Sequence, residues 1–203
     1  MQCEHCIFSC TERGEDMSID IFCRALDAGQ GSNNVCDIGG GEPTLHPMFW
    51  DMIEMAIQAN YRTVWVSTNG KNVQDAIKLS EMARNGVLAC QLSLSKYHEQ
   101  IDWEVLYAFE NCPDRCDPKS CVCAGGKGYD LRMVNLNSSI LVGQGRAKFL
   151  DFSKKHCGCH GGIVKPSGIV KQCMCDDSPV VGTVGSGFPQ LNQLECGCLG
   201  DTL

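Results

Sequence analysis

The chain has 203 residues, 43% of them hydrophobic and 20% charged, which is the composition of one globular domain, or a domain with a small extension, that can bury a core. Its 17 basic and 24 acidic residues give a net charge of −7, and because no basic stripe is present, we expect no direct binding to nucleic acid. No apolar run reaches the roughly 18 residues of a membrane span. The N-terminus lacks the basic and apolar parts of a signal peptide, so we expect no membrane partner and a cytoplasmic location.

The first half of the chain alternates between helix and strand patterns. Apolar residues at helical spacing predict helices over 17–28, 47–60, 73–85 and 102–110. Runs rich in β-branched and apolar residues predict strands over 35–38, 62–67 and 87–93. This alternation is typical of a mostly parallel sheet, which carries its ligand site at the carboxyl ends of its strands.

The second half of the chain differs in composition. Residues 111–128 are polar and rich in Cys, Gly, Pro and Asp, which indicates an inserted loop. Residues 131–142 return to a strand-like pattern, and residues 163–171 predict a hairpin that turns at Pro166-Ser167-Gly168.

Sixteen cysteines, most of them clustered, are the unusual feature of the composition. In a chain of this length without an export signal, clustered cysteines favour metal binding or redox chemistry over disulfides. Cys3, Cys6 and Cys10 place three thiolates on one loop. Three thiolates hold three irons of a [4Fe–4S] cluster and leave the fourth iron open, whereas a four-cysteine cluster only transfers electrons. The same spacing also suits a zinc loop that takes His5 as its fourth ligand.

The glycine motif, residues 39–43 (Gly39-Gly40-Gly41-Glu42-Pro43), directly follows the predicted strand 35–38. Consecutive glycines let a ligand approach the backbone closely, and the carboxylate of Glu42 can accept hydrogen bonds from an ammonium group. A tight turn between strand and helix is the plain structural alternative. The occurrence of the glycine motif together with the three-cysteine loop favours an iron–sulfur cluster over a zinc site at Cys3, Cys6 and Cys10.

On these two motifs, within residues 3–147, the chain resembles the radical S-adenosylmethionine (radical SAM) enzymes. The resemblance implies that Cys3, Cys6 and Cys10 bind a [4Fe–4S] cluster whose fourth iron is chelated by SAM, a cofactor whose amino group contacts the glycine motif. It implies reductive cleavage of SAM to a 5′-deoxyadenosyl radical that abstracts hydrogen from a substrate, with a reductant such as flavodoxin or ferredoxin. The implied SAM-binding residues are Gly40, Gly41, Glu42, Pro43, Thr68, Asn69, Ser93 and Arg146, of which the last four are equally well explained as strand-end caps or a solvated arginine.

The chain also departs from the common pattern of that family. Its spacing is Cys-x2-Cys-x3-Cys, where Cys-x3-Cys-x2-Cys is common, and Ser9 stands where the family often has an aromatic residue. Because only Met1 and Gln2 precede Cys3, we expect either that the first strand is missing from this chain or that the barrel is open on that side.

A second resemblance lies at the predicted hairpin, which has Cys157 before it and Cys173 after it. It resembles the first half of the SPASM and twitch extensions of radical SAM enzymes, whose cysteines bind an auxiliary [4Fe–4S] cluster. Further ligands would come from Cys159, Cys175, Cys196 and Cys198. A structural zinc site and metal-free thiols are the alternatives. A weaker candidate metal site, which would order the polar insert, consists of Cys112, Cys116, Cys121 and Cys123.

The predicted fold class is α/β: a partial (β/α)6 TIM-like barrel with a small cysteine-rich C-terminal extension. The radical SAM core would span 1–147 and the extension 148–203. The predicted function is that of a radical SAM enzyme, and the SPASM-like cysteines suggest a peptide or protein substrate by analogy. The rival predictions are a zinc-stabilised binding module without catalysis and a degenerate relative that binds a cluster without turnover.

Overall fold

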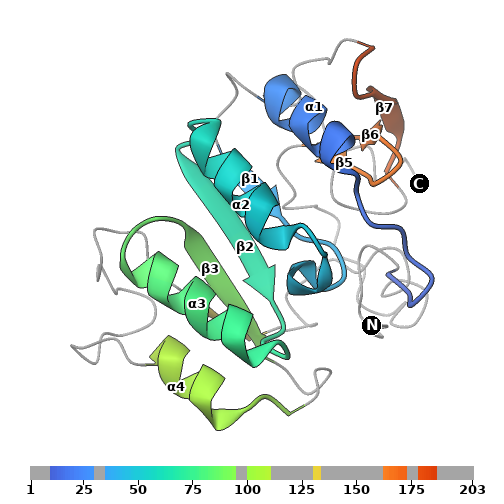
Figure 1. Cartoon of the computed structure of the whole chain (residues 1–203). Coiled ribbons are helices and arrows are strands. Elements are labelled where there is room, and N and C mark those ends of the chain that lie inside the picture. The colour runs from blue at the N-terminus through green and yellow to red at the C-terminus, as the bar shows by residue number, and fades with distance from the viewer. Residues whose placement is uncertain are drawn as a thin grey trace, which may run out of the picture. The chain divides into compact units, whose positions relative to one another are not determined.

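A computed structural model describes residues 10–29, 35–94, 100–110, 130–133, 162–172 and 178–186. The chain divides into two compact units (Figure 1). One unit is Val35–Val134, and the other combines Met1–Asn34 with Asn135–Leu203. The division into a core over 1–147 and an extension over 148–203 stays a prediction.

The Val35–Val134 unit is built on a sheet of four parallel strands. In sheet order these are β1 (Val35–Ile38), β2 (Thr63–Thr68), β3 (Ala89–Leu94) and β4 (Asp130–Met133). Since each strand lies beside the next one in the chain, right-handed crossovers place all connecting helices on one face. The predicted α/β alternation is therefore present in this unit, while closure into a barrel stays a prediction.

The connecting helices lie close to the predicted ranges. They are the 3-10 helix η1 (Pro43–Leu45) and the α-helices α2 (Phe49–Gln58), α3 (Val73–Arg84) and α4 (Trp103–Glu110). Figure 1 shows α2 and α3 against the same face of the strands. The helix predicted from residue 47 begins at Phe49, because η1 and the following turn occupy the residues before it. No helix in the described ranges is long and apolar enough to cross a membrane.

The apolar core lies on the face of the sheet that the helices cover. The strand register aligns Ile38, Val66 and Cys90, and all three side chains are buried. Gly70, at the end of β2, has a φ of 72°, and a Cβ there would lie 2.7 Å from Cδ1 of Leu92 and 3.2 Å from Cγ1 of Val105. Only glycine therefore allows this close approach of β2, β3 and α4.

The second unit combines α1 (Ile19–Gly29) with a three-stranded antiparallel sheet of β5 (Ile163–Val164), β6 (Ile169–Lys171) and β7 (Val180–Thr183). The predicted hairpin is confirmed, with the N–H of Gly168 donating to the carbonyl of Lys165 at 2.8 Å. A Cβ on Gly168 would lie 3.8 Å from Cδ1 of Ile21. Helix α1 thus packs on the turn of the β5–β6 hairpin.

Candidate functional site at the carboxyl ends of β1 and β2

The glycine motif begins directly where β1 ends. Gly39 and Gly40 are exposed, and a Cβ on either would meet no atom within 4 Å. Gly40 has a φ of 138°, a backbone conformation that L side chains rarely adopt. The turn therefore presents bare backbone toward open space, as a ligand-approach site requires.

Glu42 points into the protein, and only 8% of its surface is exposed. Its Oε1 accepts hydrogen bonds from the backbone N–H of Thr44 at 3.3 Å, the hydroxyl of Thr44 at 2.8 Å and the hydroxyl of Thr68 at 2.7 Å. Its Oε2 accepts one from the backbone N–H of Asn69 at 2.7 Å. One carboxylate thus ties the turn after β1 to the end of β2.

The two carboxylate oxygens of Glu42 differ in the number of hydrogen bonds that they accept. Oε1 is fully used by three donors, whereas Oε2 receives one donor from the described residues and has a lone pair for a second. An ammonium group that reached Glu42 would therefore have to bind at Oε2. The arrangement fits a carboxylate that holds the turn in place and offers one further acceptor position.

Thr68 and Asn69, predicted as SAM contacts or as caps, both lie at this site and both act as caps in the described structure. The hydroxyl of Thr68 accepts from the N–H of Gly70 at 3.1 Å, and Oδ1 of Asn69 accepts from the N–H of Lys71 at 2.8 Å. Both residues are buried, with 2% and 7% of their surface exposed. The cap alternative thus has direct contacts in its favour at these two positions.

Ser93 lies on β3 and is half-buried. Because side chains alternate along a strand, it shares the face opposite the helices with Ser67 and Gln91. The hydroxyl of Ser67 donates to Oε1 of Gln91 at 3.4 Å, and Asp37 of β1 is on the same face by register. This face is polar beside the glycine motif, and the sequence analysis did not select Asp37 or Gln91. The alternation of apolar Cys90 and Leu92 with polar Gln91 and Ser93 along β3 is the sequence signal that identifies this face.

The predicted metal ligands lie almost entirely outside the described residues. Cys10 is described and is half-buried. Within the described ranges no group of three or more His, Cys, Asp and Glu is placed to hold a metal. The other predicted ligands and Arg146 fall outside those ranges, so their roles stay predictions; the ligands concerned are Cys3, Cys6, Cys112, Cys116, Cys121, Cys123, Cys157, Cys159, Cys173, Cys175, Cys196 and Cys198.

Two further thiols, Cys36 and Cys90, lie on the helix-covered face of the sheet. Burial, with a smaller contribution from the charge of Asp37, raises the pKa of Cys36 to about 12. Burial, together with the charge of Glu42, raises the pKa of Cys90, and a backbone hydrogen bond at Gln91 offsets part of this. Both thiols are therefore protonated near neutral pH, which makes them poor metal ligands and nucleophiles.

Comparison with known proteins gives one partial similarity. No protein-family profile matches the chain. The chain is similar to the tungsten-containing aldehyde ferredoxin oxidoreductase cofactor-modifying protein of Pyrococcus furiosus, with 35% identity over 91 residues. The matched part is 43% of this chain and 25% of that protein, so the chain spans about a quarter of the relative's length.

Proposed function

We propose that this chain is a radical SAM enzyme whose SAM site lies at the glycine motif. The observation that carries the proposal is the exposed Gly39–Gly40 backbone at the carboxyl end of a parallel strand, held by Glu42 against the end of β2. Ligands of parallel α/β sheets bind at this edge. The proposal includes a reducing, cytoplasmic environment and an electron donor such as flavodoxin or ferredoxin.

The residues of the turn fit the cofactor. The open backbone at Gly40 admits a ligand without displacing a side chain, and the second lone pair of Oε2 of Glu42 suits the ammonium group of SAM. Cys3, Cys6 and Cys10 supply the soft thiolate donors that iron–sulfur clusters require. When bound to the cluster, SAM supplies the radical that abstracts hydrogen from the substrate. The protein's own part is to hold the turn rigid through Thr68 and Thr44 and to keep one acceptor atom in place.

Two substrate classes are considered for this enzyme: a peptide or protein, and the cofactor of another enzyme. The SPASM-like cysteines favour a peptide or protein, whereas the similar Pyrococcus furiosus protein is named as modifying the cofactor of a tungsten-containing enzyme. The polar face of Asp37, Ser67, Gln91 and Ser93 would offer hydrogen bonds to either. We propose a peptide or protein as substrate, with an enzyme cofactor as the alternative.

The test is anaerobic reconstitution with iron and sulfide, reduction with dithionite, addition of SAM and detection of 5′-deoxyadenosine by mass spectrometry. The Cys3→Ala/Cys6→Ala/Cys10→Ala variant is the control. Product from the unaltered chain alone supports the proposal, and iron per chain then gives the number of clusters. Zinc in place of iron with no product would contradict it and favour the zinc-stabilised binding module. Iron without product would indicate the degenerate relative.

A Gly39→Val variant tests the position of the SAM site separately. No atom lies within 4 Å of a Cβ at Gly39, so the fold should tolerate the side chain while a ligand approaching the turn should not. We expect an unchanged melting temperature and SAM binding, measured by calorimetry on the reconstituted protein, weakened by at least about tenfold, since every 1.4 kcal/mol of lost binding is tenfold. SAM affinity equal to that of the unaltered chain would place the site elsewhere.

A further inference from the structure

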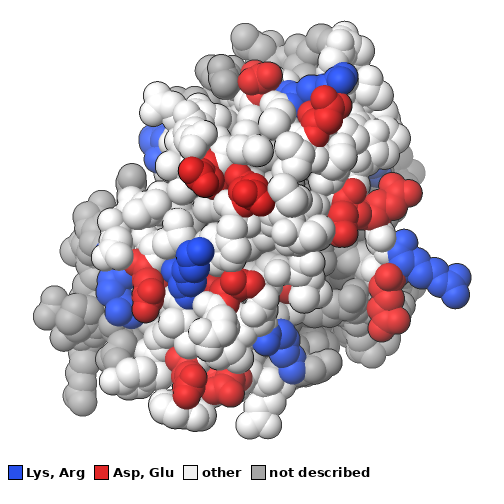
Figure 2. Space-filling model, viewed as in Figure 1, with Lys and Arg blue, Asp and Glu red and all other residues white. Residues whose placement is uncertain are grey.

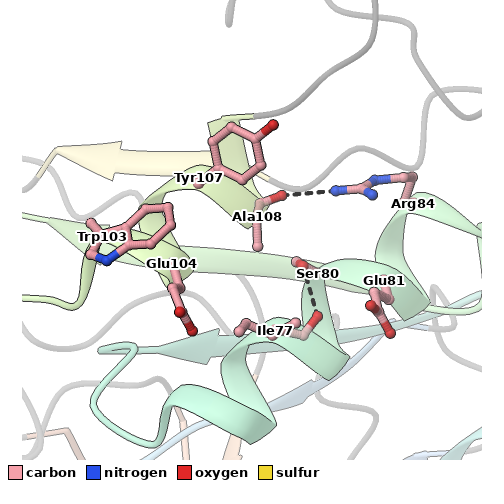
Figure 3. Close-up of a pocket in the computed structure, with 8 residues that line it drawn as sticks. All are labelled: Ile77, Ser80, Glu81, Arg84, Trp103, Glu104, Tyr107 and Ala108. Carbon is pink, nitrogen blue, oxygen red and sulfur yellow. Dashed lines mark hydrogen bonds between the residues drawn. The ribbon is translucent and has the colours of Figure 1, made fainter.

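A groove of about 610 Å³ runs between α3 and α4 on the outer side of the Val35–Val134 unit. Its lining combines aliphatic, aromatic and polar side chains with two carboxylates and one guanidinium: Ile77, Ala108, Trp103, Tyr107, Ser80, Glu81, Glu104 and Arg84 (Figure 3). Its volume lies within the range of small-ligand sites. Among the described residues, neither the glycine motif nor Cys10 lines it.

The aromatic side chains of Trp103 and Tyr107 are exposed on the surface of α4. Trp103 is 69% exposed and Tyr107 is 60% exposed, with ring centroids 6.4 Å apart and a tilt of 60°. The opposite side of α4 already anchors the helix through Val105 and Phe109, which are both almost completely buried. The two rings are thus available on the surface, where large exposed aromatic groups are typical of interaction sites.

The groove has more acidic than basic side chains, with Glu81 and Glu104 against Arg84. Glu81 and Glu104 are exposed, and neither is in an ion pair with any residue in the described part of the chain. Arg84 donates to the carbonyl of Ala108 at 2.9 Å and so joins α3 to α4 (Figure 3). Asp102 adds a further carboxylate at the start of α4, where it accepts from the N–H of Glu104 at 2.9 Å. Figure 2 shows acidic side chains together over α4.

We propose that this groove binds a basic segment of a partner protein. The charged end of an arginine or lysine side chain would lie over the rings of Trp103 and Tyr107, and Glu81 and Glu104 would add negative charge beside it. Cations are attracted to the faces of aromatic rings, and carboxylates beside them add charge-assisted hydrogen bonds. The aliphatic stem of the bound side chain would cover Ile77 and Ala108. An acidic partner is disfavoured, because the carboxylates that line the groove outnumber Arg84, whose guanidinium already donates to the carbonyl of Ala108.

The test uses the full chain and a fluorescein-labelled peptide of alternating glycine and arginine, with binding followed by fluorescence anisotropy. The site variants are Trp103→Ala and the double variant Glu81→Gln/Glu104→Gln, and circular dichroism checks that each folds. The matched control is Asp51→Asn/Glu54→Gln on α2, which removes the same charge from exposed positions elsewhere. We expect the site variants to weaken binding by about tenfold and the control by less than about twofold.

Several results would overturn the proposal. Equal weakening by the control and by Glu81→Gln/Glu104→Gln would mean that the net charge of −7 attracts the peptide without a site. Unchanged affinity in Trp103→Ala, or equal binding of a glycine–glutamate peptide, would exclude recognition of a cation by the rings. A dimer in sedimentation experiments that Trp103→Ala dissociates would show instead that a second copy of this chain occupies the groove. Trp103→Phe, which keeps a ring, should retain more affinity than Trp103→Ala.

Discussion

At the scale of single residues, Glu42 is the group on which the candidate site depends. A buried carboxylate is costly unless donors replace its lost water, and four donors do so here. The hydroxyl of Thr68 has a double role, because it donates to Glu42 and accepts from the N–H of Gly70. Loss of that hydroxyl should therefore disturb both the turn and the end of β2.

The Thr68→Val variant removes this hydroxyl while keeping the side-chain volume. We expect it to lower the free energy of unfolding by about 1–3 kcal/mol, because it leaves buried polar groups without a partner. Thr68→Ser is the matched control, since it keeps the hydroxyl and loses a methyl group, at a cost of about 1 kcal/mol. Urea denaturation of both variants measures the difference. A Thr68→Val protein as stable as Thr68→Ser would show that the hydrogen bonds to Glu42 contribute little.

At the scale of elements, β1 and β3 carry buried thiols whose protonation is linked to folding. Burial raises the pKa of Cys36 from the 9.0 of an unperturbed thiol to about 12, and it also raises the pKa of Cys90. A folded-state pKa above the unfolded one means that the stabilising contribution is complete below pH 9 and is lost as the pH rises toward the folded value. The sheet should therefore tolerate neutral pH and weaken in alkali.

We accordingly expect the free energy of unfolding to fall as the pH rises above about 9, where thiols of the unfolded chain ionise. The double variant Cys36→Ala/Cys90→Ala should be less stable at neutral pH, because it leaves small cavities, and should show a shallower decline in alkali. Chemical denaturation at a series of pH values gives both slopes. Parallel slopes for the two proteins would mean that other groups cause the alkaline loss.

At the scale of the whole molecule, the two units differ in how they can be stabilised. The Val35–Val134 unit has an apolar core between its sheet and helices, whereas the strands of the other unit are short and only Val170 among them is buried. A bound metal can supply folding free energy to such a unit. The unit of Met1–Asn34 and Asn135–Leu203 contains the predicted ligands Cys3, Cys6, Cys10, Cys157, Cys159, Cys173, Cys175, Cys196 and Cys198.

Removal of metal by a chelator from the reconstituted protein should therefore affect the two units differently. We expect faster hydrogen–deuterium exchange in α1 and in β5, β6 and β7, with little change in α2, β2 and α3. Mass spectrometry of the exchanged peptides measures this, and the Cys3→Ala/Cys6→Ala/Cys10→Ala variant shows how much depends on the N-terminal loop. Equal effects in both units, or no effect in either, would contradict a structural role for metal in the cysteine-rich unit.

The amino-acid sequence by itself determined the local elements. Helical and strand periodicities predicted α1 to α4, β1 to β3 and the β5–β6 hairpin, with boundaries off by a few residues, because these signals act within one turn or one pleat. The glycines also predicted turns correctly, since Gly40 and Gly168 have positive φ at positions where a turn was expected. The cysteine spacings define candidate metal sites, whose ligands, apart from Cys10, lie outside the described residues.

Only the tertiary structure decided which of these residues meet. Glu42 and Thr68 are 26 residues apart, and their hydrogen bond exists because β1 and β2 are parallel neighbours whose carboxyl ends share one edge. The packing of Ile21 near Gly168 and the groove of Trp103 with Glu81 likewise join segments that no local pattern connects. Periodicity reports which face of an element is buried, whereas the partner of that face depends on chain topology and side-chain packing, which are properties of the whole fold.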